Sequence, residues 1–226
     1  GTGATEVTFR TAIDSESTEN NSLTIDADTG IIEFNGAIGA IDKLNQLTVT
    51  VADQVIFGSE DTLQTNGDGP VTLIMTEGAI DIGTGTDEIS SGIIFNGGTV
   101  AGLLTVQTTD DMVRLNGPVT LETDLTIDTD PNPVAAMGGA NILFTANATI
   151  DSQATAADND VSEDNNLLLQ AGIGNISFNG NIGNAGDFNA QLGTLTIEDT
   201  TGSVTFGGAD TVTGDLGPVT AVRTNG

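Results

Sequence analysis

The chain has 226 residues and a formal net charge of −28, with only four basic side chains. Binding to nucleic acids or anionic membranes relies on Lys and Arg, so this charge argues against both kinds of partner. The sequence has no cysteine, which excludes disulfides and thiolate chemistry, and it has no run of about eighteen apolar residues that would span a bilayer.

Short segments of alternating apolar and polar residues recur along the chain, as expected for strands with one buried face. A first kind reads Leu-Thr-Ile or Leu-Thr-Val and predicts strands at residues 23–25, 47–49, 104–106, 125–127 and 195–197. After a polar turn comes a second kind, most copies of which end in Phe. It predicts strands at residues 31–34, 55–57, 93–95, 112–115, 142–144, 176–178 and 204–206.

Turn residues punctuate these strands at repeated places. Gly or Asn-Gly follows most strands of the second kind, and Gly-Pro-Val-Thr occurs at residues 69–72, 117–120 and 217–220. Gly and Asn accept positive φ, and proline is tolerated where a strand begins. These residues therefore predict sharp turns between short strands.

A longer repeat is also visible. Residues 7–9, 12–15, 30–39, 44–49 and 57–58 have counterparts, in the same order, at 142–144, 149–152, 174–183, 192–197 and 206–207. We interpret residues 1–226 as one continuous solenoid segment, with copy one spanning about 1–136 and a partial copy two about 137–226.

Two all-β folds fit these patterns. Asn-Gly between apolar runs favours hairpins and therefore an antiparallel β-sandwich. The recurrence of similar strands at intervals of roughly twenty to thirty-five residues instead favours a parallel β-helix, which we predict with about nine coils. Equivalent side chains of successive coils would then stack about 4.8 Å apart, with the phenylalanines forming one ladder.

The pattern of Leu-Thr-Ile, polar turn, Ile-x-Phe-Asn-Gly and Ile-Gly, quoted from residues 23–39 and 176–183, resembles the repeats of large bacterial secreted exoproteins. These are filamentous-haemagglutinin-like adhesins and autotransporter-passenger-like proteins. The resemblance implies a right-handed parallel β-helix, outside the cell or on its surface, that serves as a shaft, fibre or adhesive. The chain starts at Gly1 without a charged and apolar leader, which suggests a processed product or an excerpt.

Enzymatic chemistry finds little support in the composition. The carboxylate pairs Asp110-Asp111 and Glu60-Asp61 have the residue types of a glycosidase, but solvated turns explain them better. His, Trp and Tyr are absent, so a base for a Ser or Thr nucleophile and most aromatic platforms for sugars are missing. We predict a non-enzyme, with a carbohydrate-binding or carbohydrate-cleaving β-helix as the alternative.

Calcium is the most plausible ligand, because Ca²⁺ prefers spaced carboxylates and loop carbonyls. The candidate ligands lie in three acidic turns and are Asp26, Asp28, Asp128, Asp130, Asp158 and Asp160. None of these turns matches a known calcium loop. A Ca²⁺-stabilised surface module is therefore a further hypothesis beside acidic turns that keep the protein soluble.

Threonines recur in the outward position of several predicted strands, namely Thr24, Thr48, Thr72, Thr105, Thr126 and Thr196. A flat Thr column is typical of ice-binding solenoids. The positions two residues further on are mixed, so we favour ordinary strand surface.

Repeat-like sequence reaches close to both termini, and no helical or polar cap is evident. An uncovered coil exposes backbone groups and apolar side chains, which favours addition of another chain. We therefore predict head-to-tail or lateral self-assembly, with a cell-surface or polysaccharide ligand as a further possible partner.

Overall fold

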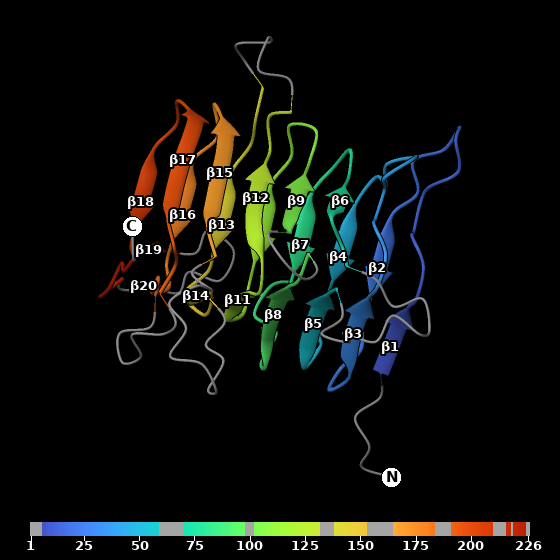
Figure 1. Cartoon of the computed structure of the whole chain (residues 1–226), viewed down its shortest axis with the longest axis horizontal. Coiled ribbons are helices and arrows are strands. Elements are labelled where there is room, and N and C mark those ends of the chain that lie inside the picture. Colours follow the sequence, from blue (N-terminus) through green and yellow to red (C-terminus); the bar gives the residue numbers. More distant parts are fainter. Residues whose placement is uncertain are drawn as a thin grey trace.

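The computed structural model describes residues 6–58, 70–97, 102–131, 138–152, 165–183, 191–209, 216–217 and 219–224. These residues form strands and turns without helices, and all strands but β19 (Gly208–Ala209) and β20 (Leu216–Gly217) lie in three all-parallel sheets. β1 (Glu6–Phe9) and β18 (Val204–Phe206) lie at opposite ends of the stack in Figure 1. The fold is therefore the parallel β-helix that the sequence predicts, and the antiparallel sandwich is excluded.

Each sheet collects one short strand from successive windings. Sheet A contains β1, β3 (Ile31–Phe34), β5 (Gln54–Phe57), β8 (Gly92–Phe95), β11 (Val119–Leu121) and β14 (Ile150–Ser152). Sheet B contains β6 (Leu73–Met75), β9 (Leu103–Gln107), β12 (Asp124–Asp128), β15 (Leu167–Gly172) and β17 (Leu195–Thr200). Sheet C contains β2 (Leu23–Ile25), β4 (Leu47–Val49), β7 (Ile80–Ile82), β10 (Val113–Leu115), β13 (Ile142–Phe144), β16 (Ile176–Phe178) and β18.

The chain visits the sheets in the fixed order A, B, C. Where a winding lacks a full strand, an isolated parallel bridge takes its place: Ile13 and Ile38 stand on side B, and Ile182 and Val222 on side A. Sheet C contains one strand from each of seven windings. The described residues therefore make seven such windings, fewer than the nine expected, because Phe95 and Leu115 belong to one winding on two different sheets. The right-handed sense of the coil stays a prediction.

Antiparallel pairing is confined to one small feature of the described residues. β19 (Gly208–Ala209) and β20 (Leu216–Gly217) form a two-stranded ribbon beside the last windings. The Asn-Gly pairs that favoured hairpins instead follow strands of the parallel sheets. Asn35, for example, comes directly after β3, and its N–H donates to the Phe9 carbonyl of the preceding winding at 2.8 Å.

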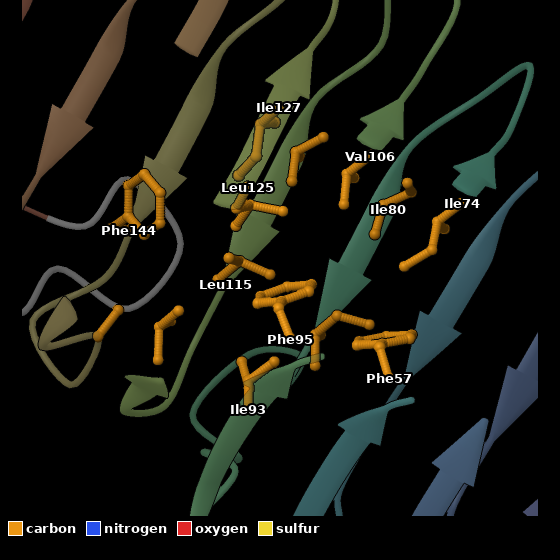
Figure 2. Packing of buried hydrophobic residues seen from close by; sticks show 14 of the residues in the cluster. Phe57, Ile74, Ile80, Ile93, Phe95, Val106, Leu115, Leu125, Ile127 and Phe144 are labelled. Atoms are coloured by element: carbon orange, nitrogen blue, oxygen red, sulfur yellow. The ribbon is translucent and has the colours of Figure 1, made fainter. Parts of the chain in front are cut away.

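The interior is a stack of apolar columns, because alternation directs every second side chain inward and the winding places like residues in register. In β3 and β5, Ile32 lies beside Val55, and Phe34 beside Phe57. Figure 2 shows the rings of Phe57 and Phe95 parallel to each other in this core, and their centroids are 5.3 Å apart. No winding covers its own apolar side chains, so the stack itself supplies the burial.

The phenylalanines form two columns, not the single ladder expected from the sequence. The first follows sheet A through Phe9, Phe34, Phe57 and Phe95, and the second follows sheet C through Phe144, Phe178 and Phe206. Leu121 continues the first column and Leu115 precedes the second. The phenylalanines therefore line side A in the N-terminal half of the rod and side C in its C-terminal half.

This change of side shows how the two copies of the long repeat are related. β3 in copy one corresponds to β16 in copy two, yet β3 lies in sheet A and β16 in sheet C. Likewise Ile38 stands on side B, whereas its counterpart Ile182 stands on side A. Copy two therefore repeats the sequence of copy one after a rotation by one side of the solenoid.

The threonines are divided in the same way. Thr24 pairs with Thr48 in sheet C, whereas Thr105 pairs with Thr126 in sheet B. Leu168 then separates Thr126 from Thr196. The threonines therefore form no single column, because the Leu-Thr-Ile segments occupy two different sides of the solenoid.

Candidate functional site

The predicted calcium ligands Asp26 and Asp28 lie together in the exposed turn after β2. The backbone N–H of Asp28 donates to Oδ1 of Asp26 at 3.2 Å, and Asp28 has a φ of 53°. An Asp that accepts from the residue two positions on stabilises a tight turn. These carboxylates thus have a local structural role in shaping the corner between sheets C and A.

Asp128, the last residue of β12, and Asp130 repeat this hydrogen bond. The N–H of Asp130 donates to Oδ1 of Asp128 at 2.9 Å, and the side-chain amide of Gln107 donates to Oδ2 of Asp128 at 3.1 Å. Both oxygens of Asp128 therefore already accept protein hydrogen bonds. Asp158 and Asp160 lie outside the described residues. Within the described ranges, no group of three or more Asp, Glu, His or Cys side chains is placed to hold a metal ion.

Two carboxylates from neighbouring windings, those of Asp110 and Asp130, lie beside Gly138. A Cβ atom placed on Gly138 would lie 2.6 Å from Oδ1 of Asp110 and 2.8 Å from Oδ1 of Asp130. Asp110 Oδ1 also accepts the N–H of Gly139 at 2.7 Å. The sequence paired Asp110 with its neighbour Asp111, and it gave no signal for the approach to Asp130, which depends on the lengths of the intervening turns.

Arg114 is a buried charge that the sequence pattern did not single out. It lies between inward Val113 and Leu115 in β10, yet its side chain is fully buried. Its Nη1 is 3.1 Å from Oδ1 of Asp81 and also donates to the Gly83 carbonyl, and Nη2 donates to the Gly85 carbonyl at 3.1 Å. Charge-assisted hydrogen bonds of this kind offset burial of a guanidinium. Arg114 thereby fixes the turn after β7 against the neighbouring winding.

The described phenylalanine rings belong to the two interior columns. Five of them, Phe34, Phe57, Phe95, Phe144 and Phe178, are buried. A sugar-binding surface uses exposed aromatic faces. Among the described phenylalanines, Phe206 is the exposed one, and it is exposed because it is the last described ring of its column.

The C-terminal winding leaves its apolar side chains uncovered. Phe206 stacks on Phe178 with ring centroids 5.0 Å apart, but it is 47% exposed, and Val204 and Val222 are 39% and 47% exposed. β17 and β18 are the last described strands of sheets B and C, so one edge of each has no strand beside it among these residues.

The N-terminal winding presents the opposite edges. β1 and β2 are the first strands of sheets A and C. Phe9, Ile13, Leu23 and Ile25 pack against the core and are only partly buried. Within the described ranges, each end therefore combines strand edges that pair with no further strand and apolar side chains, which is the composition of a surface that adds a further winding.

Comparisons with protein-family models, with curated proteins and with solved structures returned no match to this chain. Over the described residues, no helix is long and apolar enough to cross a membrane.

Proposed function

We propose that the protein is a non-enzymatic structural segment of a secreted or cell-surface fibre or adhesin, and that copies of it join end to end. The parallel β-helix suits this role because its length grows with each winding while its cross-section stays the same. The resemblance of its repeats to those of bacterial exoproteins supports an extracellular location. The strong negative charge would keep such a rod soluble.

The observation that carries this proposal is the exposure of the terminal apolar column. Phe206 has the same stacking geometry as the buried phenylalanines, but among the described residues no further winding covers it, Val204 or Val222. Apolar surface of this kind is stabilised by removal from water, at about 25 cal/mol per Å². A second solenoid end provides a complementary surface of strand edges and apolar side chains.

The alternatives have weaker support. A carbohydrate-active protein would need exposed aromatic or basic groups, whereas the sequence has only four Lys and Arg, and Arg114 is committed to a buried ion pair. A Ca²⁺-stabilised module would use the acidic turns, where Asp26 and Asp128 already accept backbone hydrogen bonds. The basic and aromatic residues therefore do not favour a carbohydrate-active protein over a structural one, and the acidic turns do not favour a Ca²⁺-stabilised module over it.

Electron microscopy of the purified 226-residue protein tests the proposal, with Phe206→Ser as the disrupting variant. The wild type is expected to form rods of several molecular lengths, and Phe206→Ser to remain as short single rods, because the substitution removes apolar area from the terminal surface. The matched control is Thr205→Ser in the same strand, which changes a neighbouring side chain outside the Phe column and should still form long rods.

Circular dichroism spectra of both variants establish that the fold is retained. Single wild-type molecules at all concentrations, together with measurable cleavage of an acidic polysaccharide, would overturn the proposal in favour of the carbohydrate-active alternative. Equal assembly of wild type and Phe206→Ser would show that the terminal column is not the contact surface.

A further inference from the structure

The two ends of the solenoid are steps of a helix, not flat discs. Because the chain visits sheets A, B and C in turn, each strand lies one third of a winding further along the axis than the one before. At the C-terminal end the last described positions are β17 on side B, β18 on side C and Val222 on side A, in rising order. On going around the axis, the end surface therefore drops by one winding between Val222 and β17, and we call this drop the step.

The N-terminal end has the same step on another side. Its first positions are β1 on side A, Ile13 on side B and β2 on side C, again in rising order. Here the step falls between β2 and β1. The end surfaces of two molecules fit together without a gap only when the step of one meets the step of the other. The side that carries β1 in one molecule must therefore lie over the side that carries β17 in the other.

We propose that a second copy docks head to tail with its axis rotated by one side, so that β1 of the incoming copy adds in parallel to β17. This inference rests on the end-to-end assembly proposed above and specifies its geometry. Ile13 of the incoming copy then lies over β18, and its β2 lies over Val222. Every sheet continues across the junction with the spacing of an ordinary winding.

Apolar side chains meet in this arrangement. The inward residues Val7 and Phe9 of β1 face Leu195 and Ile197 of β17, which are partly buried residues at the end of the core. Ile13 covers the exposed face of Phe206. The contact thus reproduces the packing between internal windings, including parallel backbone pairing at the strand edges.

The molecule itself contains a precedent for the rotation. The same repeat occupies sheet A as β3 and sheet C as β16, and both positions hold an Ile and a Phe in the core. Sides A and C of the interior therefore both accept these side chains. A junction in which sheet A continues as sheet B asks the same of side B, where Phe9 would lie beside the Leu and Ile side chains of β17.

The alternative junction keeps each sheet in line, with β2 over β18. It requires residues 219–224 to leave side A, because Val222 occupies the position that β1 would take there and is paired with Ile182. The rotated junction leaves this pairing intact, together with the bridge between Thr224 and Leu192.

Charge opposes both junctions, because the two end windings are acidic. The N-terminal winding contains Glu6, Asp14 and Glu16, and β17 contains Glu198 and Asp199. Salt screens such repulsion, with a Debye length near 3 Å at about 1 M. Assembly should therefore increase when NaCl is raised from about 0.05 M to 0.5 M.

Engineered thiols distinguish the two junctions, since the native chain has no cysteine. The double variant Thr8→Cys/Thr196→Cys places thiols on outward positions of β1 and β17, which become neighbours only in the rotated junction. The double variant Thr24→Cys/Thr205→Cys does the same for β2 and β18 in the aligned junction. Each is treated with a short bismaleimide at about 0.5 M NaCl, and covalent multimers are measured on a denaturing gel, with each single-cysteine variant as the control.

We expect at least tenfold more covalent multimer from Thr8→Cys/Thr196→Cys than from the other pair. The reverse preference would overturn the rotation while leaving end-to-end assembly in place. Long rods without cross-links from either pair would overturn the junction in favour of lateral association. An absence of rods altogether would refute the proposed function itself, so the two failures are separate.

Discussion

Phe57 and Phe206 occupy equivalent places in their strands but different places in the stack. Each ends a short strand, is followed by Gly and stacks on the Phe of the preceding winding, at 5.1 Å for Phe57 and 5.0 Å for Phe206. Phe57 is 1% exposed and Phe206 is 47% exposed. The difference arises from Phe95, which covers Phe57 from the next winding.

This contrast shows that burial belongs to pairs of windings and not to single ones. A winding in the middle of the rod receives half of its packing from each neighbour, whereas a terminal winding receives only one half. Stability should therefore be distributed unevenly, with large effects of substitution inside the rod and small effects at its end.

The largest effect is expected for truncation of the Phe column. Phe57→Ala should lower the free energy of unfolding by about 3–5 kcal/mol, because it leaves a cavity between two windings. Phe206→Ala should lower it by about 1 kcal/mol, since half of that ring is already in water. Urea unfolding followed by circular dichroism, under low-salt conditions that keep the protein monomeric, measures both. Equal losses would contradict the contrast between interior and terminal windings.

A smaller effect is expected where a glycine lets two windings approach. Gly58 has a φ of 95°, and a Cβ placed there would lie 1.9 Å from the Asn96 carbonyl oxygen of the next winding. Gly58→Ala should therefore cost about 2–4 kcal/mol, from left-handed backbone and overpacking.

The matched control is Gly208→Ala near the C-terminal end. A Cβ there would meet its nearest neighbour, Asn179 Oδ1, at an ordinary 3.4 Å. A change within about 0.5 kcal/mol is expected in the same urea assay. A large loss at Gly208 would indicate that the terminal winding is as tightly packed as the interior.

Calcium binding would produce a smaller effect than the substitutions of Phe57 and Gly58. If the turns of Asp26 and Asp128 hold Ca²⁺, calcium at ten times its dissociation constant would raise the free energy of unfolding by about 1.4 kcal/mol. Thermal melts with CaCl₂ and with EDTA measure the difference, and Asp26→Asn/Asp128→Asn should abolish it. An identical midpoint in both buffers would remove the calcium hypothesis.

Much of the local structure could be predicted from the sequence. The segments at residues 23–25 and 31–34 are strands, as expected, because apolar alternation and flanking turn residues act over a few neighbours. The Gly-Pro-Val-Thr signal at 117–120 correctly preceded a strand, β11. β7, β14 and β15 were missed as separate strands, since the expected winding had no fixed number of sides.

The candidate site was less predictable. The sequence correctly placed Asp26 in a turn, whereas Asp128 is the last residue of β12. The placement of Asp110 and Asp130 beside Gly138 involves two windings and carries no local signal. Arg114 shows the same limit. Alternation directs it outward, and its burial depends on contacts with Gly83 and Gly85 from the preceding winding.

The sequence by itself determined which side chains point inward, because alternation with a period of two is a property of each strand. Only the tertiary structure decided which side of the solenoid each strand occupies. All three sides accept Ile, Leu and Val, and sides A and C also hold Phe, so the choice depends on how far each intervening turn carries the chain around the axis. That is why two similar copies of one repeat lie on different sheets, and why the aromatic column changes sides along the rod.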